Sequence, residues 1–400
     1  MGATRRAVAA GALAAALFAG LVPAHAQSQN GAVYVQCPGD TNGDAVPDGP
    51  FDPNVRCIHL AAGDGYVTMA DGKPLYIFGF SDQTGRLPAQ IMDAGTLSAN
   101  FPAPTIRLKE GQEFYLNLTN VGMVVRPDLF DPHSVHFHGF PQAAPVFDGV
   151  PENSAVVNMG STFTYYYKLV EPGTYMYHCH VEATEHMQMG MLGNLYVEPR
   201  QNDTGYTDAA GHHTGTFAYN DGDGSTRYDV EYPIQIGSFD PNFHDQHEAV
   251  QPLPFAAMRD RYALLNGRGY PDTVNPNVLW TDTDRGPKPS QPQPSLITAA
   301  SGQRVLLRIS NLNVTRFYTL ASTIPMRVVG HNARLMRGPS GQDLYYTTSS
   351  VTLGGGESID VILDTASVSP GTYLLYTTNL NYLSNDKEDL GGMMTEIRIQ

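Results

Sequence analysis

Several features that define common protein classes are absent or scarce in this 400-residue sequence. It contains no dinucleotide-binding fingerprint, no P-loop and no Ser-His-Asp constellation with a specific spacing. Basic residues are few: 24 Lys and Arg face 39 Asp and Glu, which gives a formal net charge of −15. This balance disfavours binding to nucleic acid or to anionic membranes. Long helical patterns are also scarce, which argues against a helical fold.

Long apolar runs are limited to a single segment at residues 7–22. Arg5 and Arg6 precede the run, and Ala24-His25-Ala26 follows it as a small-x-small cleavage site, so residues 1–26 are predicted to be an export signal. The run is short for a membrane span and does not recur, so no membrane span is expected. The mature protein is expected to be periplasmic or secreted, through the Sec or the twin-arginine route.

Cysteine is rare, with three residues in the chain. Cys179 lies in the histidine-rich motif described below, which leaves Cys37 and Cys57 to pair as a disulfide in an oxidising compartment. The segment between them has the spacing at which a calcium loop begins, with Asp40, Asn42, Asp44 and Asp48. Ala45 and Phe51 stand where such a loop needs Gly and Glu, so an acidic loop closed by the disulfide is favoured over a calcium site.

Glycine and proline are abundant, with 40 and 29 residues, and they separate short strand-like runs throughout the chain. This is typical of an all-β protein. The segment PTIRLKEGQEFYLNLTN at residues 104–120 is echoed by SLITAASGQRVLLRISN at residues 295–311, and PGTY occurs at both 172–175 and 370–373. The repeat predicts two copies of one β-sandwich. The segment from Arg200 to Ser225 is rich in Gly, Asp, Asn and Thr and is expected to link them.

The most informative stretch is HCHVEATEHMQMGM, at residues 178–191. It brings together a cysteine, imidazoles and a methionine, and these are the ligand types of a blue, type 1 copper site. Such a site needs a second imidazole. The segment HSVHFHG at residues 133–139 can supply one.

Strand alternation divides these residues into two sets, because successive side chains point to opposite faces. If Cys179 points into its domain, its two neighbours in the HCH sequence point out. The inward set is then His133, Cys179, His186 and Met191, which suits one type 1 copper. The outward set is His136, His138, His178 and His180, which suits a second copper centre.

These two motifs resemble those of the multicopper oxidases, the family of laccases, ascorbate oxidases, ceruloplasmin and copper-resistance oxidases. HSVHFHG is similar to their HxxHxHG motif, and HCH…H…M to their closing motif. The resemblance implies two cupredoxin-like Greek-key sandwiches, with type 1 copper on the inward set. It also implies a type 2 copper on His136 and a type 3 pair on His138, His178 and His180. The family's usual HCH-x3-H-x4-M spacing is lengthened here, with five residues between His180 and His186.

The second copy of the repeat lacks these ligands. Tyr376, Thr377 and Thr378 stand where the first copy has His-Cys-His, and a single His331 stands in the segment that matches HSVHFHG. The expected organisation is therefore an N-terminal disulfide-clipped segment (27–58), a copper-binding domain (59–199), a linker (200–226) and a copper-free domain (227–400). The copper-free domain resembles the middle domain of three-domain laccases.

The ligand count leaves three functions open. In this family a complete oxygen-reducing cluster needs eight histidines, and the outward face supplies four. The favoured hypothesis is an oxidase in which a homo-oligomer, or a partner chain, completes the cluster. Type 1 copper would take single electrons from a small-molecule or metal-ion donor, and Cys179 with His178 and His180 would pass them on to reduce O2 to water. The alternatives are a non-enzymatic blue-copper carrier and a nitrite-reductase-like enzyme with type 1 and type 2 copper.

Several further residues carry weaker expectations. Phe147-Asp148-Gly149 resembles the Asp-Gly of laccases beside the cluster, so Asp148 is a candidate for proton relay or ligand orientation. Glu182 and Glu185 are expected on a solvated loop face, and Met176 in the core. Met187 and Met189 are either core residues or soft ligands for Cu(I). Surface roles are expected for His212, His213, His244 and His247.

Overall fold

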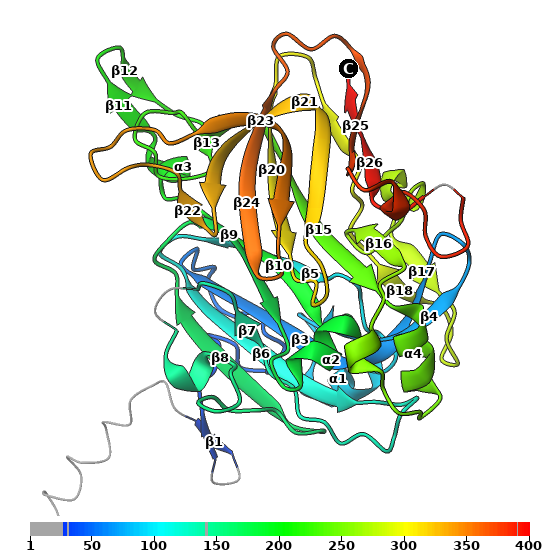
Figure 1. Cartoon of the computed structure of the whole chain (residues 1–400). Helices are drawn as coiled ribbons and strands as arrows, with labels where there is room; N and C mark the ends of the chain where they lie inside the picture. The colour runs from blue at the N-terminus through cyan, green and yellow to red at the C-terminus, as the bar shows by residue number, and fades with distance from the viewer. Residues whose placement is uncertain (1–26, 30–31, 141–142, 390) are drawn as a thin grey trace, which may run out of the picture.

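The structure is a computed structural model that describes residues 27–29, 32–140, 143–389 and 391–400. The expected export signal lies outside the described residues. No helix in the described part of the chain is long and apolar enough to cross a membrane. The fold is built almost entirely from strands, as the sequence predicts. In Figure 1 the first half of the chain, blue to green, lies below the second half, yellow to red.

The first half forms two facing sheets, named here the N-terminal sandwich. One sheet has the order β4-β3-β6-β8 and the other β5-β10-β9-β7. Their bounds are β3 (Val55–Thr68), β4 (Pro74–Asp82), β5 (Ala103–Lys109), β6 (Glu113–Gly122), β7 (His136–Phe137), β8 (Thr162–Lys168), β9 (Gly173–His178) and β10 (Leu192–Glu198). β3 begins before residue 59, so the expected boundary of the copper-binding domain falls within a strand.

Strand alternation explains how the core of this sandwich forms. In β6, Phe114, Leu116 and Leu118 are fully buried in the core between the sheets. Asn117 and Thr119, which alternate with these core residues along β6, lie on the opposite face of the same sheet.

The second half forms one large folded sheet, named here the C-terminal sandwich. Its order is β16-β15-β20-β24-β21-β25-β26-β19, with β22 and β23 paired to β21. The bounds are β15 (Val230–Phe239), β16 (Tyr262–Leu265), β19 (Ile297–Ala299), β20 (Arg304–Asn311), β21 (Tyr318–His331), β22 (Arg334–Leu335), β23 (Tyr346–Leu353), β24 (Glu357–Asp364), β25 (Gly371–Thr377) and β26 (Met394–Ile399). A separate apolar core, which includes Ile236, Leu307 and Val361, fills its interior.

The connection between the sandwiches is more ordered than the expected linker. It contains the helix α3 (Gln201–Thr204) and two small hairpins, β11 (Tyr206–Asp208) with β12 (Gly211–His213) and β13 (Thr216–Phe217) with β14 (Arg227–Tyr228). Ala218 and Tyr219 are buried against Leu306 of the C-terminal sandwich. The apolar FAY run of residues 217–219 therefore folds onto the second core, and its polar, Gly-rich neighbours form the turns around it.

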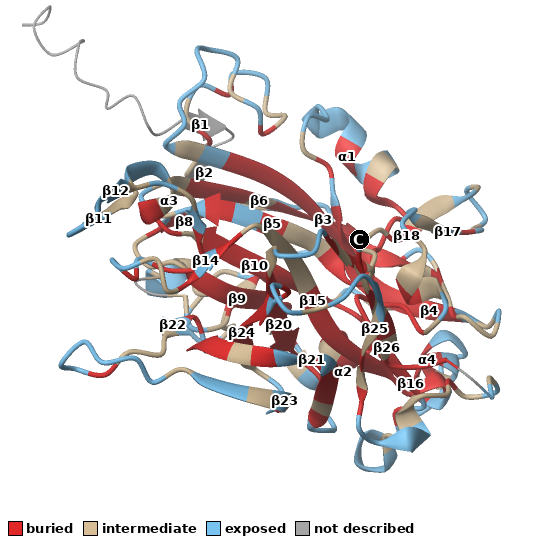
Figure 2. Ribbon diagram, turned by 90° about the horizontal axis from the view of Figure 1, so that it is seen from above, coloured by how far each residue is buried: buried red, intermediate tan, exposed pale blue. Residues whose placement is uncertain are grey.

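The remaining elements are short. Besides α3, the helices are α1 (Pro88–Gly95), α2 (Ala183–Gln188) and α4 (Pro241–Glu248); the small strands are β1 (Gln27–Gln29), β2 (Ala32–Tyr34), β17 (Leu279–Thr281) and β18 (Lys288–Gln291). Single 3-10 turns lie at Pro145–Phe147, Phe255–Ala257, Asp272–Val274 and Leu380–Tyr382. In Figure 2 the central strands are mostly buried, and exposed residues gather on loops, α1 and the β11–β12 hairpin.

The predicted disulfide is present between Cys37 and Cys57, with a Cα–Cα distance of 6.0 Å. In the loop between them the carboxylates bind backbone amides. Asp40 accepts hydrogen bonds from Gly43 and Ala45, and Asp48 accepts them from the backbone and hydroxyl of Thr41. These hydrogen bonds fix the shape of the loop, and a calcium ion at Asp40, Asn42, Asp44 and Asp48 stays a prediction from the sequence.

A buried ionic network joins the two sandwiches. Arg308 of β20 is fully buried, and its Nε donates to Glu231 at 2.8 Å. Its guanidinium donates to Thr174 of β9 at 3.2 Å and lies 4.6 Å from the ring centroid of Tyr196 in β10. Asp360 of β24 accepts hydrogen bonds from Thr174 and from Tyr219. The HCH motif begins at the end of β9. The C-terminal sandwich is therefore hydrogen-bonded to the strand that carries the candidate ligands.

We predict that Arg308→Met destabilises the protein by about 3–5 kcal/mol, because it leaves Asp360 buried without a cation and leaves Glu231 with Arg107 alone. The measurement is the urea unfolding midpoint, converted with the unfolding slope. A matched control is Arg285→Met, since Arg285 also bridges the halves, to Asp93 at 2.8 Å, but both side chains are largely exposed. The control should cost at most about 1 kcal/mol. Equal losses in the two variants would contradict the role assigned to Arg308.

Candidate metal centre

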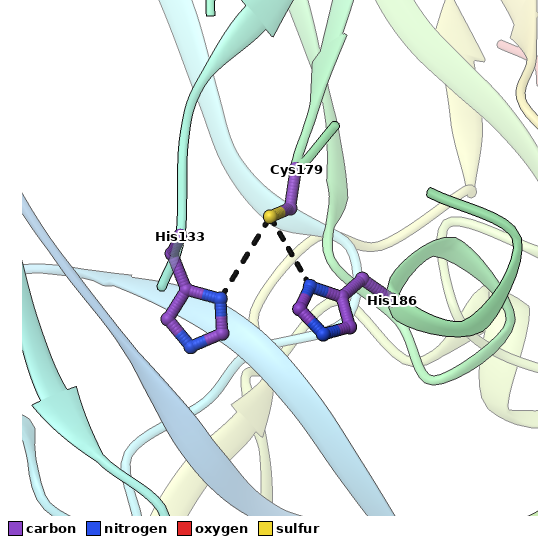
Figure 3. Close-up of side chains that lie close together, drawn as sticks. All are labelled: His133, Cys179 and His186. Carbon is purple, nitrogen blue, oxygen red and sulfur yellow. Dashed lines mark hydrogen bonds between the residues drawn. The ribbon is translucent and has the colours of Figure 1, made fainter. Parts of the chain in front are cut away.

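Three residues of the expected inward set meet in the N-terminal sandwich. His133, Cys179 and His186 are fully buried, and their donor atoms lie within 4.8 Å of one another. Cys179 Sγ is 3.7 Å from Nδ1 of His133 and 3.2 Å from Nδ1 of His186. Figure 3 shows both rings turned toward the sulfur. Two imidazoles and a thiol in a dry pocket fit a metal that accepts nitrogen and sulfur ligands, and copper is such a metal.

Local structure accounts for the position of each of these three ligands. His133 is fixed by a bridge to Val157, and Cys179 directly follows β9. The lengthened segment between His180 and His186 folds into the start of α2, which carries His186. Met191, the fourth expected ligand, is fully buried, and its carbonyl accepts a hydrogen bond from the backbone amide of Cys179 at 3.1 Å.

Charge is unevenly distributed over the two inward imidazoles. Burial, reinforced by His186, holds the pKa of His133 well below its ordinary value. Burial also opposes charge on His186, but the Cys179 sulfur and the Asp131 carboxylate together raise the pKa of His186 above its ordinary value. A metal ion at this set would therefore displace a proton from His186, because only neutral imidazole binds metal.

The expected outward set lies on the other side of the same strand. His136 of β7 pairs with His178 of β9 across the sheet, and His138 follows two residues later. His136, His138 and His178 form a group with donor atoms within 4.8 Å of one another. His180 lies beside this group, with its ring 5.1 Å from that of His136 and 5.4 Å from that of His178, but its donor atoms do not join it.

Backbone groups orient the three grouped rings in a common way. His136 Nδ1 donates to the carbonyl of Asp148 at 2.7 Å, and His178 Nδ1 donates to the carbonyl of Cys179 at 2.7 Å. The ring of His138 hydrogen-bonds to the backbone of Gly356, which belongs to the C-terminal sandwich. With Nδ1 occupied, the rings of His136 and His178 present Nε2. This is the arrangement by which proteins fix the tautomer of metal-binding histidines.

The outward donors fit a bound cation. Nε2 of His138 lies 3.0 Å from Nε2 of His178. Burial lowers the pKa of both rings, that of His178 to about 3, so both are neutral and have one N–H each. Nδ1 of His178 carries its hydrogen, so Nε2 of His178 turns a lone pair toward Nε2 of His138. A cation held by both Nε2 atoms would replace the hydrogen bond between them.

Asp148 stands beside the outward set, as the sequence predicts. Its carbonyl orients His136, and its carboxylate Oδ1 lies 3.7 Å from His136 Nδ1 and is partly exposed. Gly149 follows with φ +78°, and a Cβ there would lie 2.1 Å from the carbonyl oxygen of Val135. Only glycine therefore allows the Asp-Gly turn to approach the histidine strand so closely.

The expectation that His244 and His247 lie on the surface is wrong. Both are buried in α4, and both contact α2. Arg126 donates to Nδ1 of His247 at 3.1 Å, so His247 donates from Nε2 to Glu185 at 2.7 Å. The ring of His244 lies between the carbonyls of Tyr76 and Gln188, at 2.6 and 3.0 Å.

These contacts also correct the expectation for Glu185, whose side chain is only 13% exposed rather than solvated. Few apolar residues surround HDQH at residues 244–247, so the sequence pattern predicts an exposed polar segment there. Its burial comes from partners more than 50 residues away in the chain. By contrast, Glu182 is exposed, as are His212 and most of the hairpin around it.

Sequence reasoning also missed Asp131, two residues before His133. Its carboxylate Oδ2 lies 3.9 Å from Nε2 of His186, and neither atom has another partner among the described residues. Asp131 is placed to orient His186 from the side opposite Cys179. The methionines are core residues: Met176 packs with Phe101 and Phe239, Met187 lies against that cluster, and Met189 lies in the core of the N-terminal sandwich.

Comparison with known proteins places this region in a family. Residues 86–202 match the family model described as multicopper oxidase. An L-ascorbate oxidase from Nicotiana tabacum is 25% identical over 281 residues, 67% of this chain and 42% of that protein. A copper-containing nitrite reductase from Neisseria meningitidis is 31% identical over 176 residues, 43% of this chain and 37% of that protein. The chain spans less than half the length of these curated relatives.

Solved structures share the fold over most of the chain. The blue copper oxidase from Nitrosomonas europaea superposes with a TM-score of 0.60 at 21% identity, covering 85% of both chains. This supports the two cupredoxin-like sandwiches that the sequence predicts. At this identity the likeness concerns the fold alone.

We predict that Gly356→Ala weakens metal binding at the outward set. A Cβ at Gly356 would lie 3.0 Å from Cε1 and 3.1 Å from Nδ1 of His138, and would turn that ring away. In a Cys179→Ser background, which removes the inward thiolate, Cu(II) affinity measured by calorimetry should fall about 10- to 100-fold. The matched control is Gly302→Ala, because Gly302 has the same φ of +91° but no atom within 4 Å of an added Cβ. If both variants bind Cu(II) equally, Gly356 does not position His138.

Proposed function

We propose that the chain is a copper-dependent oxidoreductase, since residues 86–202 match the multicopper oxidase family model. The observation that carries the proposal is the presence of two donor groups on opposite sides of one strand. The inward group contains Cys179, and the outward group contains its neighbour His178. The two groups are therefore adjacent in the covalent chain.

Copper, when bound, supplies one-electron redox chemistry. The residues between the two groups supply a short connection. One path follows the covalent chain from Cys179 Sγ through the backbone to the ring of His178. A second crosses the hydrogen bond from His178 Nδ1 to the carbonyl of Cys179, at 2.7 Å. We propose that the inward set accepts single electrons from a small molecule or metal ion, and that the outward set is where O2 is reduced to water.

Oxygen reduction also consumes protons, and Asp148 is placed to hold them. Its carboxylate is 37% exposed and lies beside His136. It therefore reaches both solvent and the outward set, as a proton relay requires.

The outward set is incomplete for a cluster that needs eight histidines. The other described histidines belong to other elements: His59, His244 and His247 are buried in other contacts, His212 and His213 lie on the β11–β12 hairpin, and His331 ends β21. We propose that a second copy of the chain, or a partner chain, supplies the missing ligands at this partly exposed face. The Cys37–Cys57 disulfide supports an exported, oxidising location for the protein.

A mononuclear outward site is the second candidate. Three histidines of one chain already form a group that holds one metal ion, and nitrite reductases are among the relatives. Nitrite would then replace O2 as the acceptor. Against it, an enzyme resembling the nitrite reductases needs a histidine from the second domain of a neighbouring chain, and the matching positions here are Thr377 and Thr378.

We predict that two substitutions separate the roles of the two sets. Cys179→Ser should abolish both the blue absorption and substrate oxidation, because the thiolate ligand is lost. His138→Ala should keep the blue absorption but lower O2 uptake at least about 100-fold, because the outward set loses a donor. The measurements are the visible spectrum and an oxygen electrode with a reducing substrate.

His212→Ala, on the exposed hairpin, is the control and should leave both readings unchanged. If His138→Ala retains full O2 uptake, the outward set is not the site of oxygen reduction. If nitrite is consumed instead of O2 in the unmodified protein, the second candidate replaces the first. If neither acceptor is consumed while the blue centre still exchanges electrons, the chain is a carrier.

A further inference from the structure

A cavity of about 410 Å³ lies on the outer face of the β4-β3-β6-β8 sheet, away from both histidine sets. Its floor consists of side chains from three neighbouring strands. His59 of β3, Asn117 of β6 and Thr164 of β8 form one cross-strand row, and Thr119 and Thr162 form the next. These residues alternate with the core residues of the same strands, so the outer face of the sheet is polar where it forms the floor of the cavity.

The enclosure is built from two preformed elements. Pro88, Ile91 and Met92 of α1 form an apolar wall. The loop from Gln36 to Gly43 forms the other side, and it is fixed by the Cys37–Cys57 disulfide and by the hydrogen bonds that Asp40 accepts from the backbone. A pocket of this volume with rigid walls falls within the range of small-molecule sites.

Some polar groups of the floor remain available to a ligand. Thr164 donates to the Asn117 carbonyl oxygen at 2.6 Å, which leaves the amide N–H groups of Asn117 for the cavity. His59 Nε2 pairs with the Thr119 hydroxyl at 2.7 Å, and that hydroxyl pairs with Thr162 at 2.7 Å. His59 is only 3% exposed, yet its Nδ1 has no partner among the described residues.

Charge restricts what the cavity accepts. Among the described residues that line it there is no Lys or Arg, and the one lining carboxylate, Asp40, already accepts two backbone hydrogen bonds. Burial lowers the pKa of His59 to about 4, although Asp82 opposes this, so the imidazole is neutral near pH 7. An anion therefore finds no opposite charge among these residues, and a cation would have to compete with two backbone amides for Asp40.

We propose that this cavity binds a neutral sugar of monosaccharide size. Sugar hydroxyls both donate and accept, and so match the floor of Thr hydroxyls and the Asn117 amide. The C–H face of the ring would pack on Ile91 and Met92. This site is independent of the copper centre, so its failure would leave the proposed oxidoreductase function unaffected.

The test is saturation-transfer NMR and calorimetry on the whole protein with glucose, galactose and xylose, alongside glucuronate and glucosamine. At least one neutral sugar should bind saturably, with a Kd of about 1 mM, and more tightly than its charged analogues. Thr164→Val should weaken binding about 10-fold by removing one hydrogen bond. Met92→Trp should abolish it by filling the mouth of the cavity.

Thr352→Val is the matched control, because Thr352 also lies on a strand and hydrogen-bonds across it, to Thr319 at 2.8 Å. It should bind like the unmodified protein. The absence of saturable binding by any of the neutral sugars would overturn the proposal, as would tighter binding of a charged analogue. Binding that persists unchanged in both Thr164→Val and Met92→Trp would also overturn it.

Discussion

The alternation of side chains about Cys179 is the constraint on which the candidate centre depends. Cys179 points into the core toward His133 and His186, while His178, one residue earlier, points to the opposite side toward His136 and His138. A slip of one residue in this segment would exchange the two faces and separate both groups. The pairing of β9 with β7 and β10 prevents such a slip, since His178 is held opposite His136 on one side and Leu192 on the other.

Among its described residues the C-terminal sandwich has no cluster of metal-binding side chains, yet it supports both sets. Arg308 and Asp360 hydrogen-bond to Thr174 of β9, and His244 and His247 of α4 hydrogen-bond to α2. Gly356 reaches the ring of His138. Groups that orient ligands affect metal affinity strongly without touching the metal. A domain without a metal-binding cluster can therefore still be required for the metal centre of the N-terminal sandwich.

Local patterns predicted much of this structure. Strand runs and the repeat gave the all-β class and the two sandwiches, and the parity of HCH and HSVHFHG separated the inward from the outward residues. Long-range partners could not be predicted. The burial of His247 depends on Arg126 and Glu185, and the environment of His186 depends on Asp131, none of which a spacing pattern connects. His180 shows a further limit, since parity assigns it to the outward group but not the direction of its donor atoms.

The central claim is that one strand carries two metal sets. Its most direct test is the copper content per chain of copper-loaded protein, with electron paramagnetic resonance spectra and the mass of the same sample by light scattering. The account predicts a blue centre together with additional copper, in an assembly larger than one chain. One copper per chain with only a blue signal would contradict it, because the outward histidines would then hold no metal.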